Sequence, residues 1–527
     1  MMWFTLAAIA VGCGWLWTRI ARDTALRFGL VDRPDGRRKV QSRPVPLAGG
    51  IGVLLGAITS LAIGVLVSPT LAEDLGGEQL RFVFSLLAAA VVIATVGMLD
   101  DRFSLRARYK LLGQLFASFI LIVPGELVIR QVSFFGWHIE LGLLEIPFTF
   151  FWFLAAINAL NLLDGMDGLL GTVSVIVFVA LGTMAFTLSG SGAVAGWIAI
   201  AMAGSLVGFL RYNLPPASVY LGDCGSMLIG LVVAAVAIRA ALKGPAVALV
   251  APTVVLTLPI LDTVAAIVRR RLTGRGIAIP DRGHLHHVLQ RNGHSIRRSL
   301  ILVTVLAVLA AGGALVSSYM KNDFIAIGTA GAVVLILVLG GQFGNAEYRL
   351  LRERAVAVLK RASGGHTGIE TQVRLHGSAE WGDVWKDVTS AAERLNLQTI
   401  CLDVNAPIWH EDYHVRWDRV GPAPAPFTLW RAEIPLYGHG QAMGRLTVTG
   451  PRDEISVARK LRTLSKLVES AEMRMIAVAP SGKYPPTASN RCHPGARVTG
   501  FSPTIRSTAT VGHLSRGILD FVTVRSI

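Results

Sequence analysis

Apolar stretches of about 17–25 residues recur along the first 341 positions of the chain, separated by short polar segments. A helix of that length crosses the hydrocarbon core of a bilayer. The pattern predicts about eleven membrane spans, near residues 2–21, 47–68, 81–99, 110–124, 146–160, 169–189, 193–211, 225–242, 246–268, 299–318 and 324–341. Residues 2–21 lack a basic start and a small-residue cleavage site, so we expect them to be a retained span.

The pattern changes after the last apolar stretch. Residues 398–405 and 427–450 alternate apolar and polar positions as strands do, with a Gly-His-Gly turn inside the second segment. Apolar positions three and four apart predict amphipathic helices over residues 346–363 and 454–475. We therefore expect a small cytoplasmic α+β accessory domain over residues 345–478.

Two further features lie in the C-terminal third of the chain. The polar segment His-Glu-Asp-Tyr-His at 410–414 is interpreted as a solvated turn, with a metal site as the alternative. Residues 479–527 are rich in Pro, Ser, Thr and Arg, a composition typical of a disordered tail. The expected fold is thus an all-α polytopic membrane protein over residues 1–344, followed by the α+β domain and the tail.

Composition and charge agree with a membrane protein. Hydrophobic residues make up 52% of the chain, charged residues make up 16%, and the mean hydropathy is +0.54. The net charge of +16 is concentrated in segments 22–46 and 269–298, whereas residues 69–80 carry acidic side chains and no Lys or Arg. Because basic loops stay cytoplasmic, we expect a plasma-membrane protein with its N-terminus outside and its C-terminus in the cytoplasm.

Two other classes of function are disfavoured. Nucleic-acid binding does not suit basic residues that lie in short loops between spans. The four cysteines show no paired spacing, which argues against a disulfide framework and against a zinc site.

Four polar clusters interrupt the apolar pattern, all on the predicted cytoplasmic side. The first places Asp100 and Asp101 at the end of one span, with Lys110 and Gln114 one turn apart on the next. Adjacent carboxylates need a nearby cation, either a metal ion or a basic side chain. A charged helix end at the membrane surface is the alternative interpretation.

The second cluster is the segment INALNLLDGMDGLLG at residues 157–171. Its polar residues are spaced in threes, so they are neighbours on a helix surface. They are Asn158, Asn161, Asp164 and Asp167. A hydrogen-bond ladder between helices is one interpretation. Two carboxylates beside Gly165 and Gly168, which let other groups approach the backbone, favour a cavity for a metal or polar ligand.

The third cluster is Asp223, which lies between Gly222 and Cys224 at the start of a span. A glycine-flanked aspartate that opens a helix suits a Mg²⁺ ligand near phosphates. A simple N-cap is the alternative, because Asp is preferred at that position.

The fourth cluster combines an arginine with three histidines in a basic loop. Its members are Arg282, His284, His286 and His287. No cysteine accompanies them, and Arg and His together supply hydrogen-bond donors for a phosphate or a sugar. We therefore favour an anionic ligand over a transition metal.

Together the clusters predict a site for a Mg²⁺–pyrophosphate substrate at one membrane face. Mg²⁺ is held by one or two carboxylates plus substrate phosphates, so a Mg²⁺–pyrophosphate substrate suits these residues, with Mn²⁺ as the alternative ion. An isoprenoid partner would reach such a site from the bilayer.

The four motifs resemble those of the polyprenyl-phosphate N-acetylhexosamine-1-phosphate transferase family, over roughly residues 1–340. They follow the family's order. They are Asp-Asp at 100–101, Asn-x-x-Asn-x-x-Asp-Gly-x-Asp-Gly-Leu at 158–169, Gly-Asp-x-Gly-Ser at 222–226 and Pro-Asp-Arg-x-His-x-His-His at 280–287. The histidine motif resembles the branch that uses simple UDP-N-acetylhexosamines.

The resemblance implies transfer of an N-acetylhexosamine 1-phosphate, with N-acetylglucosamine as first choice, from a UDP-sugar to polyprenyl (undecaprenyl) phosphate. UMP leaves, and the lipid-linked diphosphosugar serves synthesis of a cell-envelope polysaccharide. Asp223 and Asp164 would bind the metal, and Asp100 and Asp101 would be catalytic at the attacking lipid phosphate. The implied substrate contacts are Asn158, Asn161, Asp167, Lys110, Arg282, His284, His286 and His287.

Two segments depart from the family pattern, so we assign no catalytic residue in the N-terminal loop. Residues 39–41 read Lys-Val-Gln where relatives have Arg/Lys-Val-His, and residues 46–50 read Pro-Leu-Ala-Gly-Gly where they have Pro-Arg-x-Gly-Gly. The alternative functions are a phospho-N-acetylmuramoyl-pentapeptide transferase, a secondary transporter, and a membrane anchor for the C-terminal domain. A homodimer, and partner glycosyltransferases bound through that domain, stay open.

Overall fold

The computed structural model describes residues 2–32, 44–135, 137–188, 193–241, 250–272, 283–344, 347–348, 351–352, 369–376, 381–406, 411–419, 429–438, 441–451, 457–478 and 523–526. The chain divides into two compact units. The first unit comprises Met1–Val268 and Gly276–Asn345, and the second comprises Arg269–Arg275 and Ala346–Ile527.

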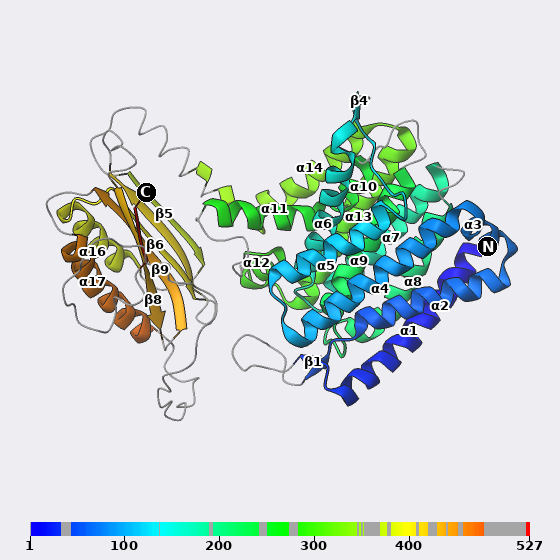
Figure 1. The fold of residues 1–527 in the computed structure, drawn as a ribbon, viewed down its shortest axis with the longest axis horizontal. Coiled ribbons are helices and arrows are strands. Elements are labelled where there is room, and N and C mark those ends of the chain that lie inside the picture. The colour runs from blue at the N-terminus through cyan, green and yellow to red at the C-terminus, as the bar shows by residue number, and fades with distance from the viewer. Residues whose placement is uncertain are drawn as a thin grey trace. The chain divides into compact units, whose positions relative to one another are not determined.

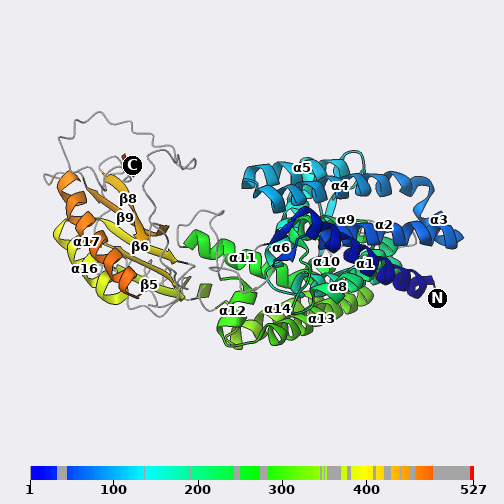
Figure 2. The same cartoon turned by 90° about the horizontal axis from the view of Figure 1, so that it is seen from below.

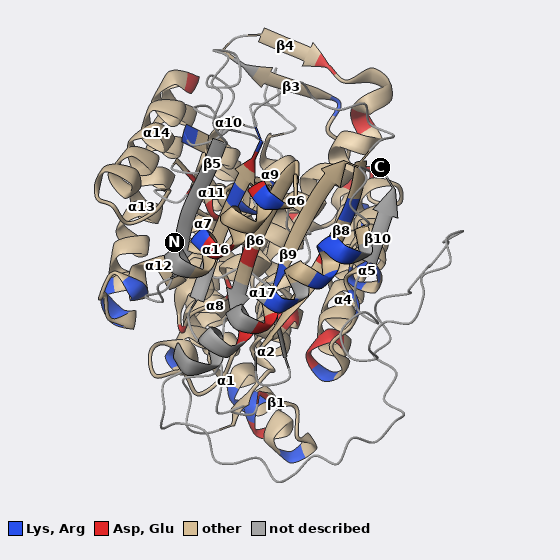
Figure 3. Ribbon diagram, turned by 90° about the vertical axis from the view of Figure 1, so that its left-hand side faces the viewer, with Lys and Arg blue, Asp and Glu red and all other residues tan. Residues whose placement is uncertain are grey.

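The first unit is a bundle of helices (Figure 1). Its longer helices are α1 (Met2–Phe28), α2 (Gly49–Val67), α4 (Leu80–Phe103), α5 (Ala107–Ile122), α6 (Glu145–Leu163), α7 (Leu169–Leu188), α8 (Ala193–Asn213), α9 (Gly222–Ala241), α11 (Thr257–Leu272), α13 (Ile296–Met320) and α14 (Asp323–Leu339). Shorter elements connect them: α3 (Pro69–Leu75), α10 (Val250–Val255), α12 (Leu285–Arg291) and the hairpin β3 (Gln131–Phe134) and β4 (Trp137–Glu140). Helices α13 and α14 are uncharged along most of their length (Figure 3).

Among the described residues, eight helices are long and apolar enough to cross a membrane. They are α1, α2, α4, α6, α7, α8, α9 and α13. Helices α5 and α14 fall short of that length, with 16 and 17 residues. The predicted span 246–268 is interrupted between α10 and α11, because Pro259 has no N–H to donate to the carbonyl of Val255. The chain is therefore a polytopic, mostly helical membrane protein.

Helix α9 lies inside the bundle, where it contacts α2, α4, α6, α7 and α8. Every residue of α9 other than Asp223 and Arg239 is buried. Small residues permit this packing. A Cβ added to Gly230 would lie 2.5 Å from the Cα of Ile157 in α6, and one added to Gly97 in α4 would lie 2.4 Å from the Cα of Cys224. Close backbone contact therefore fixes the first turn of α9.

The N-terminal loop supports the entry into α9. Strands β1 (Val31–Asp32) and β2 (Val45–Pro46) pair with each other, and the Tyr220 N–H donates to the Pro46 carbonyl at 2.9 Å. The N–H groups of Gly49 and Gly50 donate to the carbonyls of Tyr220 and Leu221 at 2.9 and 3.1 Å. The Pro-Leu-Ala-Gly-Gly segment thus has a positioning role that its sequence did not reveal.

The second unit is built on an antiparallel sheet of six strands in the order β10-β8-β9-β6-β7-β5. The strands are β5 (Ile369–His376), β6 (Thr399–Ala406), β7 (Glu411–Asp418), β8 (Leu429–Gly438), β9 (Gln441–Pro451) and β10 (Thr523–Ser526). Helices α16 (Trp381–Arg394) and α17 (Val457–Val478) lie on the same face of this sheet (Figure 2). Alternate strand residues, such as Ile400, Leu402 and Val404, form the core with these helices.

The prediction of a solvated turn at residues 410–414 is wrong. Residues Glu411–Asp418 form β7, an inner strand of the sheet, and His414 is buried with Nδ1 3.3 Å from Oδ1 of Asp403. Of the tail predicted over 479–527, only β10 lies among the described residues. Most of the helix predicted over 346–363 lies outside them as well.

Candidate active site

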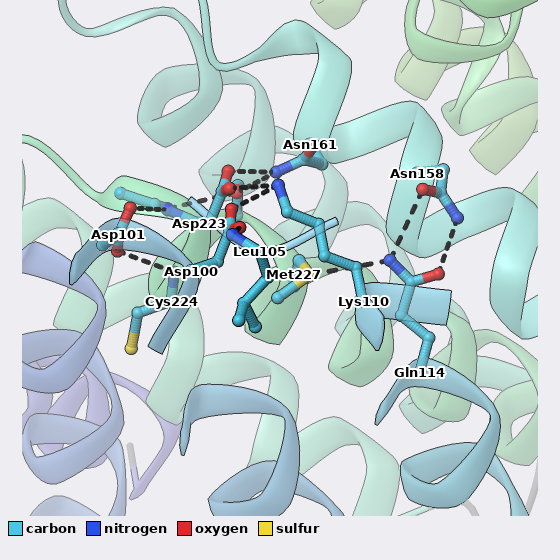
Figure 4. Close-up of polar contacts among 12 residues, drawn as sticks. Asp100, Asp101, Leu105, Lys110, Gln114, Asn158, Asn161, Asp223, Cys224 and Met227 are labelled. Carbon is cyan, nitrogen blue, oxygen red and sulfur yellow. Dashed lines mark hydrogen bonds and ion pairs between the residues drawn. The ribbon is translucent and has the colours of Figure 1, made fainter. Parts of the chain in front are cut away.

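Lys110, near the start of α5, joins two of the predicted motifs, the aspartate pair at the end of α4 and Asp223 at the start of α9. Its Nζ contacts Oδ2 of Asp100 and lies 2.7 Å from Oδ2 of Asp223 (Figure 4). Asp100 is buried, and its Oδ1 accepts the backbone N–H of Leu105 at 2.7 Å. One ammonium group therefore neutralises carboxylates from two different helices.

Asp101 holds the first turn of α9. Its Oδ1 accepts the N–H of Asp223 at 2.9 Å, and its Oδ2 accepts the N–H of Cys224 at 3.2 Å. Gly222 has φ +69°, and a Cβ added there would lie 2.5 Å from Oδ2 of Asp101. Glycine alone meets both demands without strain. The two adjacent aspartates thus differ, since both oxygens of Asp101 accept N–H groups of α9, whereas one oxygen of Asp100 contacts Lys110.

Asp223 is the residue at which three motifs meet. Nδ2 of Asn161 donates to Oδ1 of Asp223 at 2.7 Å and contacts Oγ of Ser226 at 2.8 Å. The Asp223 side chain remains 28% exposed, as does that of Lys110. A carboxylate that is oriented by neighbours yet open to solvent is suited to binding a ligand or a metal ion.

Asn158 lies on the same helix as Asn161 but has another partner. Its Nδ2 donates to Oε1 of Gln114 at 2.9 Å, and Nε2 of Gln114 lies 3.4 Å from Oδ1 of Asn158. This amide pair is the interhelical ladder that was the alternative interpretation of the motif. The ladder accounts for Asn158, whereas Asn161 belongs to the carboxylate cluster.

The turn between α6 and α7 carries Asp164 and Asp167. Burial, together with the carboxylates of Asp223, Asp101 and Asp167, raises the pKa of Asp164 to about 8. Oδ2 of Asp167 accepts the backbone N–H of Ala217 at 2.9 Å, which ties the turn to the loop after α8. Asp164 therefore lies among carboxylates whose mutual repulsion a cation would relieve.

The histidine segment lies against this turn. The imidazole of His286 packs on Gly165, where an added Cβ would lie 2.2 Å from ring atoms of His286. Burial, and the nearby His287 and His284, lower the pKa of His286 well below its usual range, so this ring is neutral. The ring centroids of His286 and His287 are 4.1 Å apart. Arg282, the remaining member of the motif, lies outside the described residues.

Asp262 in α11 was missed by the sequence analysis. Its carboxylate contacts His284 and the start of α12. The available signal was a lone carboxylate inside the apolar stretch 246–268, because ionisable residues are rare in such stretches and are usually paired.

The donor atoms suit a magnesium site that substrate phosphates complete, rather than a metal site built from protein side chains alone. No group of three or more His, Cys, Asp or Glu side chains in the described part of the chain is arranged to hold a metal by itself. Asp223 and Asp164 offer hard oxygen donors, and Mg²⁺ takes one or two carboxylates together with substrate phosphates and water. The excess of negative charge around Asp164 also favours a cation.

Comparison with known proteins agrees with the family that the motifs indicate. Residues 83–241 match the model of glycosyl transferase family 4. The chain is 32% identical over 301 residues to a probable undecaprenyl-phosphate N-acetylglucosaminyl 1-phosphate transferase of Bacillus subtilis, covering 57% of this chain and 80% of that protein.

Two further relatives have similar identity. The decaprenyl-phosphate N-acetylglucosaminephosphotransferase of Mycolicibacterium smegmatis is 32% identical, covering 61% of this chain and 83% of the relative. The undecaprenyl-phosphate alpha-N-acetylglucosaminyl 1-phosphate transferase of Escherichia coli is also 32% identical, covering 57% of this chain and 79% of the relative. With this identity and coverage, the chain belongs to the polyprenyl-phosphate N-acetylhexosamine-1-phosphate transferases of glycosyl transferase family 4.

Proposed function

We propose that the protein transfers N-acetylglucosamine 1-phosphate from UDP-N-acetylglucosamine to a polyprenyl phosphate in the plasma membrane, with release of UMP. The names of the relatives include this sugar phosphate and an undecaprenyl or decaprenyl phosphate. The product would be a lipid-linked diphosphosugar for synthesis of a cell-envelope polysaccharide.

One observation supports the proposal most directly. Three carboxylates, those of Asp100, Asp101 and Asp223, converge with Lys110 and with Asn161 of a third motif at the first turn of α9 (Figure 4). The carboxylate of Asp164, from the same motif as Asn161, is close enough to Asp223 and Asp101 for their charges to raise its pKa. Phosphoryl transfer depends mainly on positioning and charge neutralisation, and this cluster offers groups for both.

We assign Mg²⁺, with Mn²⁺ as the alternative, to Asp223 and Asp164. When bound, the ion would neutralise charge on the donor pyrophosphate and on the phosphoryl group in transit. Asn161 fixes the Asp223 carboxylate through its 2.7 Å hydrogen bond, and Asp101 fixes the backbone of the same residue. Asp101 therefore acts through Asp223 in this proposal.

Asp100 and Lys110 are assigned to the attacking lipid phosphate. The ammonium group of Lys110 would bind that phosphate, and Asp100 would orient the ammonium group. An oxygen of the lipid phosphate attacks the phosphorus that carries the sugar, and the bond from that phosphorus to the UMP oxygen breaks. A lipid phosphate is already ionised near neutral pH, so we favour this single displacement over a covalent aspartyl intermediate.

The remaining predicted residues are assigned to the donor substrate. Asn161 and Asp167 would line the nucleotide side of the site, whereas the predicted contact of Asn158 is replaced by its pairing with Gln114. The sugar-phosphate side would be formed by Arg282, His284, His286 and His287. The contact between His286 and Gly165 supports this division, because it brings the histidine segment to the acidic turn.

The topology we propose has about eleven spans, with α5, α14 and the interrupted α10–α11 segment added to the eight longer helices. The N-terminus would lie outside, and the site and C-terminus would face the cytoplasm. The basic end of α11, with Arg269, Arg270 and Arg271, supports that orientation.

UMP release by the purified full-length protein tests the proposal, with UDP-N-acetylglucosamine, polyprenyl phosphate and Mg²⁺ supplied. Asp223→Asn removes a charge at nearly constant shape, and we expect a rate at least about 100-fold lower. Asp74→Asn is the matched control. Asp74 lies in α3, before the start of α4, and accepts the Nε1–H of Trp197 at 2.8 Å. Substrate flux across proteoliposomes without UMP release would instead indicate a transporter.

A further inference from the structure

Asp262 is a buried carboxylate to which none of the sequence motifs assigns a role. It lies in α11 and is 1% exposed. A buried charge is costly unless it is paired and hydrogen-bonded, so the contacts of Asp262 need an explanation.

Both oxygens of Asp262 are bound to the histidine segment. Oδ2 lies 3.0 Å from Nδ1 of His284, and Oδ1 accepts the backbone N–H of Leu285 at 2.8 Å. The carboxylate therefore holds the His284 ring and the first residue of α12 at the same time. The His284 side chain is also buried, at 8% exposed, so the pair is shielded from solvent.

This contact determines which nitrogen of the His284 ring carries the proton. A carboxylate accepts hydrogen bonds, so Nδ1 carries a hydrogen and donates it to Asp262. In the neutral ring Nε2 then has a free lone pair, and in the charged ring it becomes a second donor. Carboxylates that bind one ring nitrogen in this way orient histidines whose other nitrogen acts on a ligand.

The position of the His284 ring is related to that of the next histidine ring in the segment. The rings of His284 and His286 are nearly parallel, with an interplanar angle of 4° and centroids 6.1 Å apart. His286 in turn packs on Gly165 of the acidic turn. Asp262 and Gly165 are thus two fixed points between which the histidine segment is held.

We propose that Asp262 is a positioning residue for the transferase reaction, acting by fixing the ring tautomer of His284 and the start of α12. The inference rests on the proposed function, because it assumes that His284 faces the sugar-phosphate donor. It predicts an effect on the UDP-sugar and none on binding of the lipid phosphate.

Asp262→Asn is an informative change because it keeps the side-chain shape. The backbone N–H of Leu285 can only donate, so the amide oxygen stays with it. The amide NH₂ group then faces Nδ1 of His284, and that nitrogen has to accept. The ring proton moves to Nε2, so the variant changes the tautomer while both hydrogen bonds are retained.

The experiment measures UMP-release kinetics of the full-length protein carrying Asp262→Asn, His284→Gln, both changes, or Asp74→Asn as control. We expect Asp262→Asn to lower kcat/KM for UDP-N-acetylglucosamine by about 10- to 100-fold, with KM for polyprenyl phosphate unchanged. The double variant should be no less active than His284→Gln alone, since Asp262 acts through His284. Asp74→Asn should match wild type.

A second readout needs no substituted Asp262. In ¹⁵N-histidine spectra of the wild-type protein at mildly alkaline pH, the signal lost in His284→Gln should show a protonated Nδ1 and an unprotonated Nε2. The opposite tautomer would overturn the proposal even if Asp262→Asn did not fold.

Three kinetic outcomes would also overturn it. They are wild-type kinetics in Asp262→Asn, a KM for polyprenyl phosphate that rises as much as the KM for UDP-N-acetylglucosamine, and losses that multiply in the double variant. In each of these cases the wild-type protein still releases UMP, so only the role of Asp262 fails. Absence of UMP release from the wild-type protein would instead refute the proposed function and the role of Asp262 with it.

Discussion

At the scale of single residues, the two adjacent aspartates at the end of α4 have different environments. Asp100 is buried and faces Lys110, whereas both oxygens of Asp101 accept N–H groups from the first turn of α9. A sequence motif presents them as an equivalent pair. In the structure Asp101 binds the backbone of α9 and Asp100 contacts the lysine, so we expect substitutions at the two positions to have different consequences.

Gly222 offers a test of this arrangement. A side chain at this position would be strained by the positive φ and would clash with the Asp101 carboxylate. We expect Gly222→Ala to cost about 1–3 kcal/mol in strain and to lower the UMP-release rate by about 10- to 100-fold through displacement of Asp223. Thermal unfolding and UMP-release assays measure the two effects.

Gly312→Ala in α13 is the matched control, because a Cβ added to Gly312 meets no described atom within 4 Å. If Gly222→Ala behaved like Gly312→Ala, the contact between Asp101 and α9 would have no part in positioning Asp223.

At the scale of elements, the positions of the apolar helices followed from the sequence, because each one is a long apolar run. The interruption between α10 and α11 was not predicted, but it could have been inferred from the proline at 259. The β7 strand could not, because His-Glu-Asp-Tyr-His has the polarity of a turn and its burial depends on pairing with β5 and β6. Tertiary contact outweighed local composition there.

The buried His414 of β7 makes the second unit sensitive to alkaline pH. Burial opposes protonation of this ring, but the hydrogen bond with Asp403 and the nearby Cys401 outweigh it and raise the pKa to about 9. The folded state therefore binds a proton more tightly than the unfolded state, whose histidine has its usual pKa near 6.5. The stabilisation is complete below about pH 6.5 and is lost as pH rises through about 9.

Hydrogen exchange in β6 and β7 measures this effect when wild type and His414→Gln are compared at equal pH. We expect wild-type protection to exceed that of the variant at neutral pH, and the difference to shrink as pH rises through about 9. A difference that grew with pH would contradict the raised pKa.

At the scale of the whole molecule, the sequence motifs predicted which residues converge but left their partners open. Asn161, Lys110 and Asp223 meet as the motifs suggested. Asp262, and the support that Gly49 gives to the entry into α9, lay outside the motifs because their effect passes through backbone groups and a second side chain. Such supporting contacts depend on how separate helices pack, which a single sequence does not encode locally.

Transfer of N-acetylglucosamine 1-phosphate to a lipid phosphate is the reaction that we propose for this site. The most direct measurement supplies the purified full-length protein with polyprenyl phosphate, Mg²⁺ and either UDP-N-acetylglucosamine or UDP-N-acetylmuramoyl-pentapeptide, and quantifies UMP together with the lipid-linked product. We predict equal amounts of UMP and lipid-linked N-acetylglucosamine diphosphate from the first donor, and no turnover of the second. Turnover of the pentapeptide donor alone, or of neither donor, would refute the proposed reaction.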